Sequence, residues 1–160
     1  ACPRAAFSQV IYTPEETGVM IAYASVYGNT ENTAHVLASM LAERGVRNIA
    51  MYDVSQTHAS VIVAESFRCS HLVFASPTYH AGIFVNMENT LHDIAAHNVL
   101  NRKVAIIENG SWAPVAGKVM SKMMENSKNL TYAENNVKIF PALSDESRAQ
   151  VDALAAELCG

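Results

Sequence analysis

The sequence predicts a doubly wound α/β domain, in which a five-stranded parallel sheet carries helices on both faces. Apolar strand candidates alternate with amphipathic helix candidates five times after residue 18. The middles of the strand candidates are almost wholly apolar, as expected where both faces of a sheet are covered. Three of the segments that follow strands are rich in hydroxyl and turn residues, and they would all lie at one edge of the sheet. The 160 residues suit one domain.

The composition disfavours several classes of partner. Half of the residues are hydrophobic, 16% are charged, and the net charge is -4, so a nucleic-acid or anionic membrane surface is not expected. No apolar run reaches the length of a membrane span, and no secretory signal is visible. The three cysteines are far apart, without a C-x-x-C pair, which favours a reducing compartment and a cytoplasmic location over a disulfide framework or a zinc site.

The chain divides into a leader and a single domain. Residues 1–18 have no clear periodicity and are punctuated by Pro3, Pro14 and Gly18, so we expect a leader or linker there. Residues 19–160 form the expected domain.

The first half of the domain provides three strands and two helices. The first strand is expected at 19–24, followed by a helix at 30–44 whose apolar residues recur at helical spacing. The second strand is expected at 46–54. A helix then begins at 55–57 and continues to 68, and the third strand follows at 70–75.

The second half continues the alternation. A helix is expected at 85–97, the fourth strand at 103–108, and a helix after the loop 109–114 that continues to about 127. The fifth strand is expected at 137–143. Ser144 then caps the last helix, because a serine followed by acidic residues favours a helix start.

The segment after the first strand has the chemistry of a phosphate site. Ser25, Asn29 and Thr30 supply neutral donors, Gly28 allows a tight turn, and a helix N-terminus follows. The segment lacks the Gly-Lys-Ser/Thr of the nucleotide P-loop and the G-x-G-x-x-G of dinucleotide sites. The alternative is an ordinary turn in which Ser25 or Asn29 caps the helix.

Two further segments at the same edge favour a flat aromatic ligand. S-P-T-Y-H-A-G at 76–82 follows the third strand, and N-G-S-W-A-P at 109–114 follows the fourth. Tyr79 or Trp112 could stack on a planar ring while backbone amides bind its polar edge. The alternatives are a solvent-exposed turn tyrosine and a tryptophan that packs the next helix onto the sheet. Taken together, the three segments favour a flavin site.

The three motifs closely resemble the flavodoxin-like domain of the flavo-diiron (A-type flavoprotein) family over about residues 19–158. The resemblance implies the flavodoxin-like fold with strand order 2-1-3-4-5 and non-covalently bound FMN. It assigns the phosphate to the first segment and the isoalloxazine ring to the other two. The cofactor-binding residues expected on this basis are Ser25, Val26, Tyr27, Gly28, Asn29, Thr30, Pro77, Thr78, Tyr79, His80, Ala81, Gly82, Asn109, Gly110, Ser111 and Trp112.

The resemblance also bears on the partner. Family members carry a metallo-β-lactamase-like domain with a di-iron centre, and its H-x-E-x-D signature is absent here. The resemblance therefore implies an electron-transfer flavoprotein module within oxidoreductase chemistry, without catalytic residues or metal ligands of its own. It would pass electrons to a di-iron domain or another redox partner for reduction of oxygen or nitric oxide, with a rubredoxin-like protein as one candidate donor. A homo-oligomer is compatible with the sequence.

Two other functions are known for folds of this kind of topology. A free-standing FMN-dependent NAD(P)H:quinone reductase of the same fold would need space over the flavin for both substrates. A phospho-receiver would need acidic residues at the ends of the first and third strands, where this chain has Ala24-Ser25 and Ala75-Ser76. Because the three segments lack Lys and Arg and Glu108 ends the fourth strand, we expect neutral-to-negative surroundings that disfavour an anionic reduced flavin.

Overall fold

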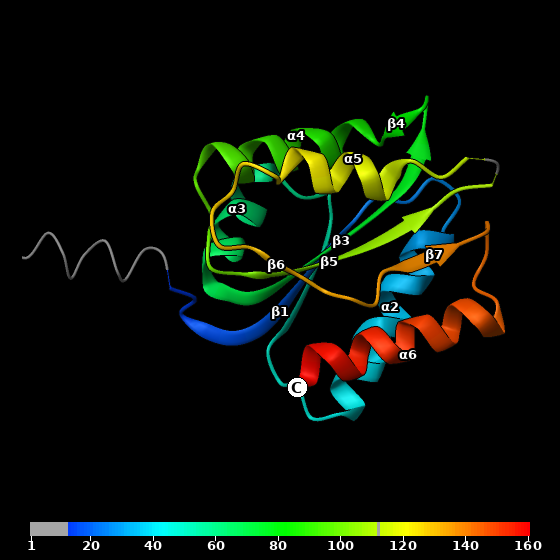
Figure 1. The fold of residues 1–160 in the computed structure, drawn as a ribbon, viewed down its shortest axis with the longest axis horizontal. Helices are drawn as coiled ribbons and strands as arrows, with labels where there is room; N and C mark the ends of the chain where they lie inside the picture. The colour runs from blue at the N-terminus through cyan, green and yellow to red at the C-terminus, as the bar shows by residue number, and fades with distance from the viewer. Residues whose placement is uncertain (1–12, 112) are drawn as a thin grey trace, which may run out of the picture.

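The protein is described by a computed structural model that covers residues 13–111 and 113–160. A twisted parallel sheet runs through its centre in the order β2-β1-β3-β5-β6, as Figure 1 shows. The main strands of this sheet are β1 (Glu16–Tyr23), β2 (Ile49–Asp53), β3 (Cys69–Tyr79) and β5 (Lys103–Asn109). The expected order 2-1-3-4-5 is confirmed, with β5 as the fourth strand.

Helices cover both faces of the sheet. On one face lie α3 (Ala59–Arg68), α4 (Val85–Ala96) and α5 (Ala116–Met123). On the other lie α2 (Asn29–Glu43) and α6 (Asp145–Cys159), which pack against each other (Figure 1). This is the doubly wound arrangement that the alternating pattern predicts.

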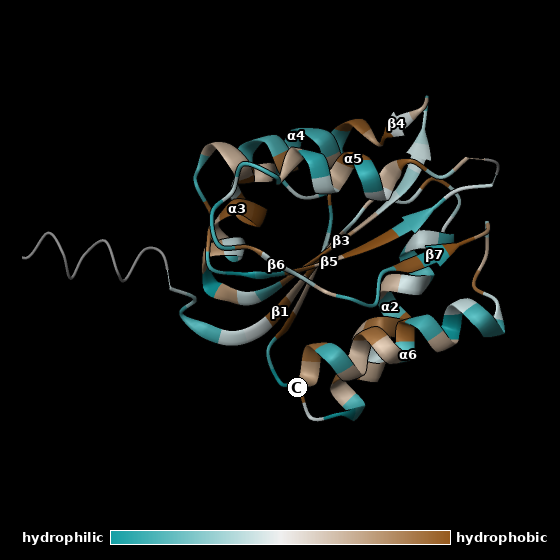
Figure 2. Cartoon of the chain, viewed as in Figure 1, coloured by the Kyte–Doolittle hydropathy of each residue, from teal (hydrophilic) through white to brown (hydrophobic). Residues whose placement is uncertain are grey.

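The sheet separates two hydrophobic cores. Successive residues of a strand point to opposite faces, so Met20 and Phe74 pack under α3, α4 and α5, whereas Ile21 and Val73 pack under α2 and α6. All four side chains are fully buried. Figure 2 shows β5 as hydrophobic along most of its length and hydrophilic at its carboxyl end, where the chain leaves the core.

The first two strands and the second helix differ from expectation at their ends. β1 begins at Glu16 rather than 19, and residues 1–12 of the expected leader lie outside the described residues. β2 covers Ile49–Asp53 rather than the expected 46–54. The helix expected from 55–57 begins at Ala59. The reason is a turn: the Asp53 carboxylate accepts from the Ser55 N–H at 2.7 Å, and His58 caps the helix instead.

The third strand is longer than expected. It continues to Tyr79, and a short antiparallel strand, β4 (Gly82–Ile83), folds back on it through Thr78↔Ile83 and Tyr79↔Gly82 pairs. Residues expected in a loop therefore belong to a β-hairpin that projects beyond the sheet.

The fifth strand is divided. It consists of β6 (Thr131–Tyr132), paired with the start of β5, and β7 (Val137–Ile139), paired with its end. The expected strand at 137–143 therefore stops at Ile139, and α5 stops at Met123 rather than 127. The last helix begins as expected, since the Ser144 hydroxyl accepts from the Ser147 N–H and the Ser144 N–H donates in return to the Ser147 hydroxyl.

Candidate functional site

The carboxyl ends of β1, β3 and β5 surround a hollow of about 210 Å³. It lies at the point where the chain crosses from one side of β1 to the other, which is where open parallel sheets bind ligands. Its walls come from all three expected segments and from the segment after β7. The lining residues are Ser25, Val26, Tyr27, Asn29, Thr30, Pro77, Thr78, Tyr79, Asn109, Gly110, Ser111 and Pro141.

Several of the expected residues do not line this hollow. Gly28 shapes the first loop from outside it, and His80, Ala81 and Gly82 lie in the β3–β4 hairpin beyond it. Trp112 lies outside the described residues. Sequence analysis missed Pro141, whose only signal was its place after the strand adjacent to β5.

The first loop is shaped by its glycine. Gly28 has φ 82°, in the left-handed region that glycine adopts without strain. Its N–H donates to the Ser25 hydroxyl at 3.0 Å, closing the turn. No side chain caps α2, so neither Ser25 nor Asn29 acts as the helix cap that the alternative interpretation required. The positive end of the helix is therefore presented to the hollow.

The β3–β4 hairpin turns through two residues with left-handed backbones. His80 has φ 47° and Ala81 has φ 59°, as a type I′ turn requires. The His80 and Tyr79 rings pack nearly perpendicular to each other at a centroid distance of 4.3 Å. This turn places Tyr79 at the mouth of the hollow, where it is 43% exposed.

Two polar side chains connect the site to its surroundings. The Thr78 hydroxyl accepts from the backbone N–H groups of Val115 (3.0 Å) and Ala116 (3.2 Å), at the start of α5. The Asn109 amide donates to the Thr30 hydroxyl at 3.2 Å. The loops of the site are thus joined to one another and to α5 by the polar side chains of the strand ends.

The position of Glu108 corrects one expectation. Its carboxylate points to the opposite face of the sheet from Asn109 and away from the hollow, toward the start of α5. There it accepts from the Gly117 N–H at 2.9 Å and pairs with Lys138 at 3.1 Å. Glu108 therefore does not line the site, and its charge faces a lysine and the start of a helix instead.

The rim of the hollow is apolar and exposed. Tyr27 is 90% exposed, Val26 46%, and Phe140, next to Pro141, 55%. The described lining contains no Lys, Arg, Asp or Glu. Neutral donors at the base and large apolar side chains at the rim suit a ligand with a small anionic end and a flat apolar body.

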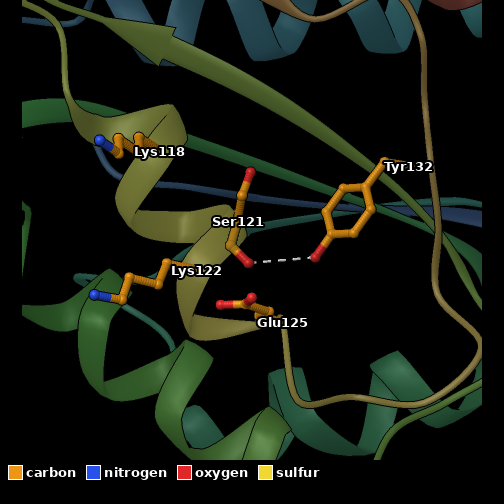
Figure 3. A pocket seen from close by; sticks show the side chains of 5 residues that line it. All are labelled: Lys118, Ser121, Lys122, Glu125 and Tyr132. Carbon is orange, nitrogen blue, oxygen red and sulfur yellow. Dashed lines mark hydrogen bonds between the residues drawn. The ribbon is translucent and has the colours of Figure 1, made fainter.

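A larger hollow of about 600 Å³ lies along α5, lined by Lys118, Ser121, Lys122, Glu125 and Tyr132. In Figure 3, the Tyr132 hydroxyl points to the backbone of α5, and it donates to the Ser121 carbonyl at 3.4 Å. None of the residues expected in the site lines it.

Residues 13–111 and 113–160 contain neither a metal-ligating cluster nor a membrane-spanning helix. No cluster of three or more His, Cys, Asp or Glu side chains with the spacing of a metal site occurs there. In the same residues, no helix has the length and apolar character needed to cross a bilayer.

Comparison with known proteins shows the fold. No protein-family model matches the chain, and no curated protein sequence matches it. Among solved structures, rubredoxin oxygen:oxidoreductase from Desulfovibrio gigas superimposes with a TM-score of 0.85 at 21% identity over 91% of this chain. The flavodiiron protein from Giardia intestinalis superimposes with a TM-score of 0.84 at 14% identity over 98% of this chain. Flavodoxin 1 from Bacillus cereus superimposes with a TM-score of 0.75 at 17% identity over 89% of this chain.

The chain spans very different shares of these proteins. It covers 36% of the Desulfovibrio protein and 38% of the Giardia protein, but 97% of the Bacillus flavodoxin. Fold and sheet order together define the class: the chain has the flavodoxin-like fold.

Proposed function

We propose that this chain binds FMN at the carboxyl edge of its sheet and transfers electrons between redox partners. The observation that carries the proposal is the uncapped N-terminus of α2, which opens into a hollow built from three strand ends. When bound, FMN supplies one- and two-electron chemistry, and the protein supplies its binding and orientation.

The first loop fits a phosphate group. The first-turn N–H groups of α2 carry the positive end of the helix dipole. The Ser25 hydroxyl already accepts a bond from Gly28, so its own hydrogen is available to an anion. No acidic side chain lines the hollow, so nothing in its described lining repels a dianion.

The rest of the hollow fits part of a flat ring. Tyr79 on the β3 side and residues 109–111 on the β5 side both line the hollow. The volume of about 210 Å³ is below the ~300–1,000 Å³ of sites that enclose a whole ligand. The flavin would therefore keep one edge in solvent, where electrons can pass to a partner.

The partner is the second part of the proposal. Two of the similar structures are, by name, a flavodiiron protein and a rubredoxin oxygen:oxidoreductase, and this chain covers little more than a third of each. We propose that a di-iron centre or comparable redox centre on another domain or protein receives the electrons and reduces oxygen or nitric oxide. A rubredoxin-like protein is the proposed donor, and the cytoplasm the proposed location.

The experiment is a titration of the purified protein with FMN and with riboflavin, followed by flavin fluorescence. Because riboflavin lacks the phosphate, FMN should bind more tightly. Ser25→Ala should weaken FMN binding about tenfold, because one hydrogen bond to a charged group is lost. The affinity for riboflavin should not change. Ser55→Ala is the matched control, since Ser55 follows β2 at the same edge but does not line the hollow.

Two outcomes would change the proposal. If the folded protein binds no FMN, the flavin function is wrong while the fold stands. If NAD(P)H rapidly reduces and so bleaches the bound flavin without any partner protein, the quinone reductase function is favoured over the electron-transfer function.

A further inference from the structure

We propose that Glu108 and Thr78 are positioning residues, which hold the described residues of the segment 109–115 (109–111 and 113–115) in place, so that 109–111 form one wall of the ligand site. The inference rests on the proposed function, since it assigns this wall to the flavin ring. Neither the Glu108 carboxylate nor the Thr78 hydroxyl needs to contact the ligand for this role. Both side chains act by fixing the start of α5, to which the segment is directly joined.

Glu108 acts from the end of β5. Its side chain is only 7% exposed, and one carboxylate oxygen accepts from the Gly117 N–H at 2.9 Å, within the first turn of α5. The other oxygen pairs with Lys138 of β7 at 3.1 Å. A carboxylate at this end of a helix interacts favourably with both the free N–H groups and the helix dipole. Glu108 therefore connects β5, β7 and α5.

Gly117 is part of the same arrangement. A Cβ atom at this position would lie 3.0 Å from Oε2 of Glu108 and 3.1 Å from its Cδ. A larger residue would require the carboxylate to move by a few tenths of an ångström. The close approach of Glu108 to the backbone is thus favoured by the absence of a side chain at 117.

Thr78 acts from the end of β3, on the neighbouring strand. Its hydroxyl accepts from the N–H groups of Val115 and Ala116, the two residues before Gly117. Gly110 packs against both the threonine and the far end of the segment, since a Cβ there would lie 3.3 Å from Thr78 Oγ1 and 3.0 Å from Pro114 Cβ. Three consecutive N–H groups at the start of α5 are therefore bound by strand side chains.

The other end of the segment is fixed as well. The Asn109 amide binds the Thr30 hydroxyl, and the Gly110 N–H donates to the Ile139 carbonyl at 3.1 Å. A wall held at both ends without the ligand loses little conformational entropy when the ligand binds. Releasing its α5 end should weaken binding of the flavin ring, whether or not a phosphate is attached.

The test compares wild type with Glu108→Ala, Gly117→Ala and Glu108→Gln. We expect FMN and riboflavin to bind about tenfold more weakly to Glu108→Ala, and to be weakened less by Gly117→Ala. The ratio between the two ligands should be unchanged in both variants. Glu108→Gln keeps an oxygen for the Gly117 N–H and should recover most of the affinity. Amide hydrogen exchange of the free protein should rise at Gly110 and at 115–117 in the alanine variants.

Glu65→Ala is the control, because its carboxylate also binds neighbouring side chains but lies at the end of α3 away from the hollow. It should lower the melting temperature without affecting either flavin. Three results would each overturn the inference. Glu65→Ala could weaken flavin binding as much as Glu108→Ala does, or Glu108→Ala could leave amide hydrogen exchange unchanged. The third is that Glu108→Ala weakens the binding of FMN but not of riboflavin. If wild type binds no flavin, the proposed function fails, and the exchange measurement alone decides whether Glu108 holds the segment.

Discussion

The side-chain amide of Asn109 donates a 3.2 Å hydrogen bond to the hydroxyl of Thr30, and thereby joins the end of β5 to the first turn of α2. Both side chains are buried, with 7% and 2% of their surfaces exposed. A buried amide without an acceptor loses its hydration and gains nothing in return, so this bond matters to the stability of the protein.

We expect Thr30→Val to lower the free energy of unfolding by about 1–3 kcal/mol, the cost of an unpaired buried polar group. Thr30→Ser keeps the hydroxyl and should lose less. Urea denaturation monitored by circular dichroism measures both variants. Equal stability of the valine variant and wild type would show that the Asn109 amide finds another partner.

Gly28 provides a test of the first loop. Its φ of 82° lies in the left-handed region, but a Cβ there would have no heavy atom within 4 Å. Gly28→Ala should therefore cost about 1–2 kcal/mol from the backbone alone. Gly28→Asn should cost less, because asparagine tolerates this conformation. Thermal unfolding should give melting temperatures that decrease from wild type to Gly28→Asn to Gly28→Ala. An alanine variant as stable as wild type would contradict this prediction.

Ala81 provides the opposite test. With φ 59°, this alanine adopts a conformation that glycine accepts more readily. Ala81→Gly should raise the free energy of unfolding by up to about 1 kcal/mol, the strain relieved less the added entropy of the unfolded chain. Ala156→Gly, at an exposed position within α6, should lower it by about 0.5–1 kcal/mol. A destabilised Ala81→Gly variant would mean that the turn carries no strain.

Glu157 predicts how stability depends on pH. Burial alone would raise the pKa of its carboxyl group, but the backbone N–H groups of Asn135 and Glu134, with Lys103, lower this pKa from 4.5 to about 2. The ionised form is thus the one stabilised in the folded protein. Its contribution is complete above the unfolded pKa near 4.5 and is lost as the pH falls through about 2.

Comparison of wild type with Glu157→Gln tests this dependence. The difference in free energy of unfolding should be constant above about pH 5.5, fall below it, and reach its minimum near pH 2. Denaturant midpoints measured across this range give the difference. A difference that does not change with pH would show that the charge of Glu157 contributes nothing.

Most of the sheet and its helices could be predicted from the sequence, because the strands β1, β3 and β5 are covered on both faces and therefore form nearly continuous apolar runs. The exact ends of the helices and strands could not be predicted. The start of α3 depends on the Asp53 turn, and the division into β6 and β7 leaves segments of two and three residues, too short for any periodicity.

The site shows the same limit. Sequence position placed the three segments at one edge, and residues of all three line the hollow. It did not show that Glu108 points away from that hollow or that Thr78 accepts from α5, since both depend on side-chain direction along a strand. Nor could it place Pro141, which reaches the hollow only because β7 pairs with the end of β5.

The pairing of β1 with both β2 and β3 has a consequence for folding. Val19 lies opposite Ile49 on one side and His71 on the other, so closing the centre of the sheet brings together segments far apart in the chain. Such non-local pairing is slow to form. The hollow does not exist before this step, so a ligand can bind only after it. Occupancy of the hollow would therefore slow global unfolding while leaving the rate of folding unchanged.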